Sequence, residues 1–417
     1  MAITSGSFQS LYQVYYPQAE LPYLVPQNLP LINMLVGGNS DGAVSGFITD
    51  MPWLLSPSVG VSQSFSEAQT QSNNAPTPLR PQVRLSQIYK LVDFSDKDEL
   101  LSDGAASYGD LMENVVGGAR NELLSNLDQL CHGAGSGIRC QVAAGVAVTT
   151  TTIPLTTQAT ETFFELNQRI VICSNAPTSG VPPTIVQGPL VVTNVSQTSI
   201  TVNAVSGADI QGLYIAKAGD TMGFNTASLE PSLIGMDAYN PIVAPQPREN
   251  FLGVDRSVFS TRASGYRFDG STRSSEAAIK RLATLMSQGG VNAGGAKVFM
   301  APVDMDALED KLASYQRFQQ SQLGVFFFDS IALNSPLGRL EIMSDPHQTQ
   351  GFARIYSPGG LQLQYRNGLP HLATLSGGVD QEFGQNFDGR SVRLRAYTQI
   401  KCLDPRKQGI VALPATV

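Results

Sequence analysis

The stretch YGDLMENVVGGARNELLSNLDQL, residues 108–130, is the longest helical pattern in this sequence. Its apolar residues recur every three or four positions, which places them on one face of an α-helix; they are Tyr108, Leu111, Val115, Ala119, Leu123, Leu127 and Leu130. Asp and Ser residues precede the stretch as cap candidates, and the run Gly133–Gly137 follows it. We therefore predict a long helix over residues 105–131 that ends in a C-cap and turn. A phosphate-binding loop is disfavoured because no strand leads into these glycines.

The segment before this helix, residues 53–90, has the pattern of two strands around a polar turn. Val59, Val61 and Phe65 fall on one face of an alternating stretch, and Glu67–Pro81 is rich in Gln, Ser, Asn and Pro. An isolated two-stranded hairpin is marginal in water. We therefore favour an arm that lies on a neighbouring subunit over a mobile surface loop.

The N-terminal part and the overall charge indicate an acidic chain without a basic arm. Residues 1–52 are rich in Pro, Gly, Leu and Tyr without sustained periodicity, and they predict an extended arm whose partners lie elsewhere. No Lys or Arg precedes Arg80, and the formal net charge is −7. This charge argues against electrostatic wrapping of nucleic acid. The N-terminus also lacks the features of a secretory signal, so we expect synthesis in the cytoplasm.

The composition narrows the class of protein further. A chain of 417 residues is expected to form roughly two to three domains. Only 15% of the residues are charged, against about 25% in typical soluble domains, so much of the surface is neutral or buried against other subunits. No apolar run is long enough for a transmembrane helix. The four cysteines form no CxxC pair and predict no disulfide framework.

After the long helix the sequence changes to short strands. Residues 146–222 are dominated by Thr, Val, Ser and Pro, and turn clusters separate the predicted strands: Arg169–Cys173, Leu190–Val195, Ile200–Val205 and Leu213–Ala216. We predict a small all-β domain, a barrel or sandwich, inserted into the host domain.

The second half, residues 223–417, mixes helices and strands, and the fold class is therefore α+β. Ser274 can cap a helix that ends at Gly289, a strand is expected at Lys297–Met300, and Asp304 opens another helix. The clearest alternation in the chain comes near the end, where one face carries Val392, Leu394, Ala396, Ile400 and Cys402.

A search for chemistry finds no catalytic, cofactor-binding or metal-binding motif in the sequence. The three histidines, His132, His347 and His371, have no partner at a metal-ligand spacing such as HExxH, and no GxSxG elbow occurs. Asp304 and Asp306 could act as paired carboxylates, but a helix start explains them better. We predict that the chain is not an enzyme.

The order of these segments resembles the major capsid proteins of tailed double-stranded DNA bacteriophages, which have the Hong Kong 97-type (HK97-like) fold. That order is an arm, an extended hairpin, a long helix, a β-domain and a mixed half that ends in strands. Four stretches strengthen the resemblance: Ile88–Asp96 with the helix end Leu130–Gly133, Gly253–Ser257, Val298–Pro302 and Ala396–Pro405.

The resemblance implies a role for each part. Residues 1–52 would be the N-terminal arm, and residues 53–90 the E-loop, a β-hairpin lying over an adjacent subunit. Residues 91–145 would belong to the P-domain with its spine helix, and residues 146–222 to the inserted domain. Residues 223–417 would form the A-domain and the remainder of the P-domain.

The resemblance also implies a function and partners. The subunit would assemble with itself into hexamers and pentamers of an icosahedral head that encloses double-stranded DNA without sequence-specific binding. Assembly would take place in the host bacterial cytoplasm, without a membrane. Residues 1–52 show no coiled-coil pattern, so a separate scaffolding protein is expected, together with a portal and a decoration protein.

Charged residues of the hairpin are the candidate contacts between subunits. They are Glu67 and, on the return limb, Arg80 and Arg84, and Arg256 in Gly253–Ser257 is a fourth candidate. Some members of the family crosslink subunits through an E-loop lysine. The first lysine here is Lys90, at the base of the hairpin, so we expect a shell held without covalent crosslinks.

Three other classes of protein compete with this interpretation. An encapsulin-type nanocompartment shares the fold but encloses protein cargo; the inserted β-domain and long polar hairpin disfavour it. A hydrolase with an added β-domain requires a catalytic constellation that the sequence lacks. A tail or fibre component is disfavoured because no internal repeats occur.

Overall fold

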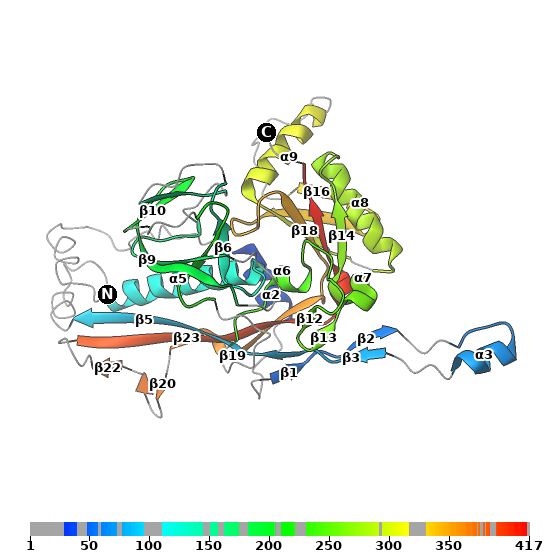
Figure 1. Cartoon of the computed structure of the whole chain (residues 1–417), viewed down its shortest axis with the longest axis horizontal. Helices are drawn as coiled ribbons and strands as arrows, with labels where there is room; N and C mark the ends of the chain where they lie inside the picture. The colour runs from blue at the N-terminus through cyan, green and yellow to red at the C-terminus, as the bar shows by residue number, and fades with distance from the viewer. Residues whose placement is uncertain are drawn as a thin grey trace.

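The computed structural model describes residues 29–39, 48–56, 60–72, 77–95, 111–144, 151–156, 162–174, 182–203, 205, 210–221, 231–291, 294–316, 331–372, 374–375, 378–379, 381–383 and 389–414. Within these residues, no helix is both long and apolar enough to cross a membrane. The chain forms a body of two sheets with helices, a small barrel, and an arm that projects from the body (Figure 1).

A long sheet and the spine helix form the base of the body. Strand β23 (Gly389–Cys402) pairs antiparallel with β5 (Ser86–Ser95) on one side and with β19 (Leu361–Leu372) and β22 (Gln381–Phe383) on the other. Helix α5 (Leu111–His132) lies along this sheet (Figure 1). Both predicted patterns are confirmed by burial: the buried side chains include Ala119, Leu123, Leu127 and Leu130 of the helix and Leu394, Ala396, Ile400 and Cys402 of the strand.

The central core joins the spine helix to segments from both ends of the chain. Helix α2 (Pro30–Asn39) buries Leu31 and Leu35 in this core. Trp53 also packs there, and its Nε1 donates to the carbonyl of Cys402 over 2.9 Å. The prediction of an extended arm is therefore wrong for Pro30–Asn39, which form a helix, and the partners of Leu31 and Leu35 lie in distant segments of the same chain. Residues 1–28 and 40–47 lie outside the described residues.

A second, mixed sheet holds the other core. Its strand order is β14 (Tyr266–Asp269), β24 (Gln408–Ala412), β18 (Phe352–Tyr356), β15 (Lys297–Met300), β17 (Gly338–Ser344) and β16 (Ile331–Ser335). Helix α8 (Ser275–Gln288) packs on it and is capped by Ser274, whose hydroxyl accepts from the amide of Ala277, as predicted. Helix α9 begins at Pro302 and ends at Gln316. Asp304 lies in its first turn instead of opening it, and its carboxylate accepts from the amide of Gly351 over 2.7 Å.

Most of the remaining short elements lie between these two cores along the chain. The short elements are α6 (Met236–Tyr239), β12 (Asn250–Phe251), β13 (Val254–Asp255), η2 (Ser257–Phe259), α7 (Ser260–Ser264), β20 (Thr374–Leu375), β21 (Gly378–Val379) and η3 (Pro405–Lys407). The strand pair β20–β21 lies between β19 and β22. Tyr239 of α6 donates its hydroxyl to the carbonyl of Ile400 over 2.7 Å, which ties α6 to β23.

The segment after the spine helix forms a closed barrel. The strand order is β6 (Ile138–Gln141), β11 (Tyr214–Lys217), β8 (Arg169–Cys173), β9 (Ile185–Val195), β10 (Ser199–Val202) and β7 (Thr152–Pro154). A bridge between Val142 and Leu155 joins the last strand to the first, and the barrel encloses its own apolar core. All four predicted strands are present, but the first strand begins at Ile138, before the predicted range 146–222. Arg139 at the entrance binds Asp220 at the exit, with 2.9 Å between Nη2 and Oδ2, and Asn126 of α5.

The arm consists of two short strand pairs and a terminal helix. Strand β1 (Ile48–Asp50) pairs with β4 (Gln82–Arg84), and β2 (Trp53–Ser56) pairs with β3 (Thr77–Leu79). Helix α3 (Phe65–Ser72) lies at the far end, away from the body (Figure 1). The predicted strand at Phe65 and polar turn at Glu67 are wrong, because both residues lie in helix α3. The stretch SEAQTQS contains good helix formers, and the side chain of Gln71 donates to that of Glu67, one helical turn earlier, over 3.1 Å.

Candidate functional site

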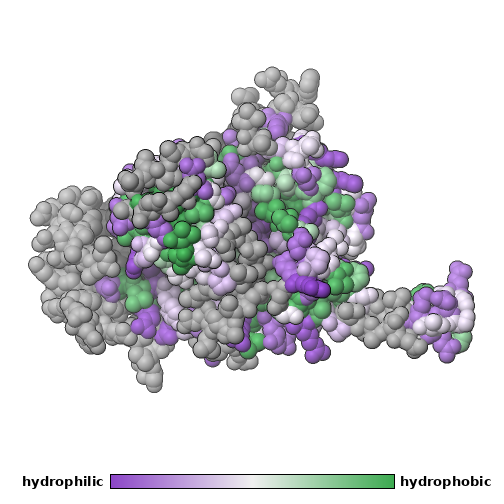
Figure 2. Space-filling model, in the orientation of Figure 1, coloured by the Kyte–Doolittle hydropathy of each residue, from purple (hydrophilic) through white to green (hydrophobic). Residues whose placement is uncertain are grey.

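The end of the arm is a surface that the chain leaves uncovered. The side chain of Phe65 is 83% exposed, and that of Val61 is 96% exposed. Around them the surface of the arm is mostly hydrophilic in the view of Figure 2. Glu67, a predicted contact residue, is exposed on α3 beside them. Two large apolar side chains held this far from the body gain burial only against another molecule.

The other two hairpin charges lie nearer the base of the arm. Arg80 follows β3, Arg84 ends β4, and both side chains are exposed. The backbone of Arg84 is held by the body, because Gln399 Nε2 donates to its carbonyl oxygen over 2.9 Å. The structure therefore places Glu67 at the end of the arm and the two arginines at its attachment, and it does not bring the three together.

A shallow groove lies where the arm meets the body. Its lining includes Trp53 and Leu54 of β2, Leu403 and Arg406 near η3, and Arg262 of α7. Leu54 is 63% exposed, whereas Arg262 is fixed by donating to the carbonyl of Leu55 over 2.6 Å. The groove therefore combines an uncovered apolar side chain with fixed positive charge at the base of the arm.

Arg256, the fourth predicted contact, lies inside the chain. Its side chain is completely buried, with its guanidinium carbon 3.7 Å above the ring of Phe251. Its nitrogens donate to the carbonyl of Ala238 over 2.7 Å and to the carboxylate of Glu249 over 3.2 Å. Burial lowers the pKa of Arg256 to about 10, so the group stays charged at neutral pH. A side chain that is buried and bonded within its own chain cannot reach a neighbouring subunit, so we do not propose Arg256 as a contact between subunits.

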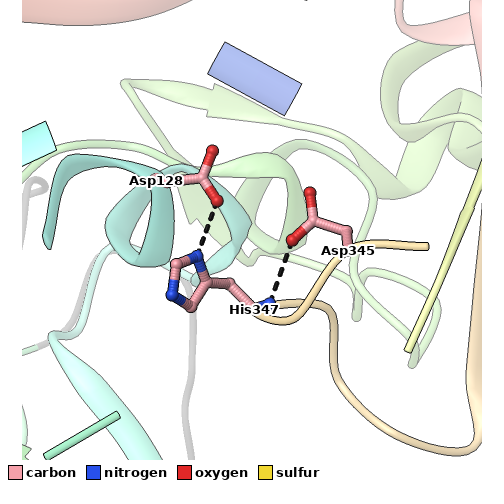
Figure 3. Close-up of side chains that lie close together, drawn as sticks. All are labelled: Asp128, Asp345 and His347. Carbon is pink, nitrogen blue, oxygen red and sulfur yellow. Dashed lines mark hydrogen bonds and ion pairs between the residues drawn. The ribbon is translucent and has the colours of Figure 1, made fainter. Parts of the chain in front are cut away.

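A buried polar cluster forms where the spine helix meets the segment after β17. It consists of Asp128 and His132 of α5 and of Asp345 and His347, and we call it the buried histidine cluster. His347 Nδ1 lies 2.7 Å from Asp128 Oδ2, and the backbone amide of His347 donates to Asp345 Oδ1 over 2.9 Å (Figure 3). His132 Nε2 lies 3.0 Å from Asp345 Oδ2 and 3.9 Å from Asp128 Oδ2.

The charges in this cluster influence one another strongly because water is excluded. Burial by itself lowers the pKa of His132, but Asp345 and Asp128 outweigh this effect and raise it above its ordinary value. Burial raises the pKa of Asp345, but His132 and His347 together outweigh this effect, so the pKa of Asp345 lies below its ordinary value. Asp128, Asp345 and His347 also offer ligand atoms that all lie within 4.8 Å of one another.

Sequence spacing alone did not reveal this cluster. Asp128 and His132 are four residues apart on a helix and so share a face, which is a weak signal. Their partners come more than two hundred residues later, and only the fold places Asp345 and His347 beside them. The third histidine, His371, has a side chain outside the described residues.

Comparisons with known proteins identify the fold. A scan against models of protein families finds no match, and neither does a search of curated protein sequences. Among solved structures, a chain of the cyanophage A-1(L) capsid asymmetric unit matches 99% of this chain over 100% of its own length, with a TM-score of 0.56 and 10% identity. The chain has the HK97-like fold of a phage capsid protein.

Other capsid-like structures align over similar lengths at lower similarity. The encapsulin SrpI of Synechococcus elongatus PCC 7942 covers 100% of this chain with a TM-score of 0.46 and 8% identity. The capsid of cyanophage P-SCSP1u covers 97% with a TM-score of 0.44 and 9% identity. At these scores neither match bears on function.

Within the phage-capsid fold, the two candidate sites differ in kind. The arm lies outside the body and leaves apolar and charged side chains uncovered. The buried histidine cluster joins two parts of the same chain, and its four side chains are almost entirely shielded from solvent. The first is suited to contact with another molecule, and the second to holding one molecule together.

Proposed function

We propose that this chain is the structural subunit of an icosahedral phage head, assembled as hexamers and pentamers around packaged double-stranded DNA. The observation that carries the proposal is the projecting arm on a body with the phage-capsid fold. The arm ends in Val61 and Phe65, which its own chain leaves almost fully exposed. A second copy of the chain is the natural partner because repetition of one contact builds a closed shell.

The free energy of burying apolar surface favours contact between the end of the arm and a neighbouring copy of the chain. Strand β2 is held to the body through Trp53. Helix α3 lies beyond the strand pair, away from the body (Figure 1), and a helix of 8 residues is marginal in water by itself. Apolar burial contributes about 25 cal/mol per Å², so covering Phe65 and Val61 on a second copy stabilises both the arm and the contact. Glu67, Arg80 and Arg84 are the proposed polar contacts of this interface, and they contribute little individually because exposed ion pairs are weak.

The charge of the chain suggests what the other components of the head must do. A net charge of −7 does not favour condensation of DNA by this subunit. We therefore propose that a separate scaffolding protein shapes the shell, that DNA enters through a portal, and that a decoration protein is a further partner. In this proposal the barrel decorates the exterior or braces the capsomers, and the shell assembles in the host cytoplasm before it becomes part of the virion.

Removal of the end of the arm tests the proposal. A variant without residues 62–78, with a short Gly-Ser link in their place, loses α3 while the body keeps its two cores. We expect wild-type protein to sediment as large particles and this variant to remain as folded small species. Glu67→Ala, Arg80→Ala and Arg84→Ala serve as matched controls and should change particle yield little.

Two outcomes would argue against the proposal. Wild-type particle yield from the deletion would show that the arm is not an assembly element. Particles that contain a protein cargo and no nuclease-protected DNA, when isolated from the native host, would favour the encapsulin-type alternative.

A further inference from the structure

We propose that the buried histidine cluster is a structural metal site, in which Asp128, His132, Asp345 and His347 bind one zinc ion. This inference does not depend on the proposed function. It rests on the geometry of the ligand atoms, on two fully buried carboxylates and on the groups that orient the ligands.

Three candidate ligand atoms converge on one small volume: those of Asp128, Asp345 and His347 all lie within 4.8 Å of one another. His132 lies beside them, with its Nε2 3.0 Å from Asp345 Oδ2 and 3.9 Å from Asp128 Oδ2, and His347 Nδ1 lies 2.7 Å from Asp128 Oδ2. Tetrahedral zinc with bonds of about 2.0–2.1 Å separates its ligands by roughly 3.3 Å. The three separations of 2.7, 3.0 and 3.9 Å bracket this value, and His132 must move closer to His347 to complete a site of four ligands.

Buried negative charge is the second line of evidence. The carboxylates of Asp128 and Asp345 are fully buried, where a charge is costly unless it is paired, and their ion-pair partners are the imidazoles of His347 and His132. Arg354 is the cation that influences His132, but it is engaged by Asp237 and the carbonyl of Asn240. A divalent cation between two neutral imidazoles and two carboxylates brings the cluster to zero net charge.

Two buried atoms point into the cluster without a well-formed hydrogen bond. His132 Nε2 and Asp345 Oδ2 lie 3.0 Å apart as an ion pair, and neither atom has a geometrically well-formed hydrogen bond among the described residues. Both atoms belong to side chains that are less than one-tenth exposed. Polar atoms in such a position are expected to be satisfied in the native state, and coordination to a shared ion satisfies both.

Neighbouring groups orient the candidate ligands through hydrogen bonds, as is common around metal ions in proteins. His132 Nδ1 lies 3.1 Å from Gln348 Oε1, so donation to that oxygen leaves Nε2 with a lone pair for the ion. Asp128 Oδ1 accepts from the amide of Ile32 over 3.3 Å, and Asp345 Oδ1 accepts from the amide of His347. To bind the ion through Nδ1 as a neutral imidazole, His347 must carry its single proton on Nε2, so the ion replaces the hydrogen bond between His347 Nδ1 and Asp128 Oδ2.

The ligand set and its burial indicate zinc in a structural role. Imidazole nitrogens favour zinc among the common divalent ions, and four protein ligands leave no open position for a substrate. The ion would join α5 to the segment after β17, and thereby fasten the two cores of the body together.

Metal content and stability of the full-length wild-type protein test this site. We expect about one zinc per chain by mass spectrometry of protein purified without chelator. Treatment with EDTA should lower the melting temperature by several degrees, and added zinc sulfate should restore it. Cobalt added to the stripped protein should give the visible absorption of tetrahedral Co²⁺.

Variants separate this site from adventitious binding. Asp345→Asn and His347→Gln should lower metal content about tenfold or more and abolish the response to zinc. Glu276→Gln, which removes a carboxylate on the surface of α8, is the matched control and should retain both. The proposal is overturned if folded wild-type protein has no zinc and its melting temperature responds to neither EDTA nor added zinc, because the cluster is then held by ion pairs alone.

Discussion

At the scale of single residues, removal of the buried Arg256 side chain should be costly. Its guanidinium is fully buried and holds the carbonyl of Ala238 and the carboxylate of Glu249. Arg256→Ala leaves these acceptors without their donor and opens a cavity beside Phe251. We expect a loss of about 3–5 kcal/mol in the free energy of unfolding, measured by chemical denaturation of the unassembled chain.

Arg406 supplies the control for this prediction. It binds Asp404 through two hydrogen bonds of 3.0 Å, but its side chain is 45% exposed. Because water replaces such a contact readily, Arg406→Ala should cost less than about 1 kcal/mol. Equal losses for the two variants would contradict the structural role given to Arg256.

At the scale of elements, the contact between α6 and the end of the spine helix depends on Gly235. A Cβ atom at Gly235 would lie 2.3 Å from the carbonyl oxygen of Gly133 and 2.5 Å from that of Leu130. These atoms are backbone atoms at the end of α5, which cannot move aside as a flexible side chain can. Gly235→Ala should therefore destabilise the chain by about 1–3 kcal/mol. A melting-temperature comparison with Gly294→Ala checks this, because a Cβ at Gly294 meets no atom within 4 Å. If the two variants melt alike, the close approach of α6 to α5 is not as described.

Helices and strands whose apolar residues recur at a regular spacing could be predicted from the sequence. Features that depend on contacts between distant segments could not. The apolar face of α5 and the alternation of β23 each follow from one repeated spacing, and burial confirms both. Helix α3 was missed because its few apolar residues also fit a strand, and its helix-forming polar residues decide the conformation. The buried histidine cluster was missed for another reason: its two halves come from segments more than two hundred residues apart, which no local pattern encodes. The burial of Arg256 was missed because its charge suggested the surface, although its partners Ala238, Glu249 and Phe251 are close in the sequence.

At the scale of the whole molecule, we expect a shell without covalent bonds between subunits. The first lysine, Lys90, lies on β5 within the long sheet, where it pairs with Glu122 of the spine helix. Residues 53–89 therefore supply no amine at the end of the arm. Mature particles boiled in SDS should give a single band at the monomer mass of 44.5 kDa. A ladder of higher bands that survives reduction would show that crosslinks form after all.

The central claim is that this chain builds a closed shell in which each arm lies on a neighbouring copy. Electron cryomicroscopy of particles from the purified wild-type protein tests it most directly. The structure predicts closed icosahedral shells in which α3 contacts the adjacent subunit and Phe65 and Val61 are covered. Isolated chains, open assemblies, or shells in which α3 contacts only its own chain would contradict the claim.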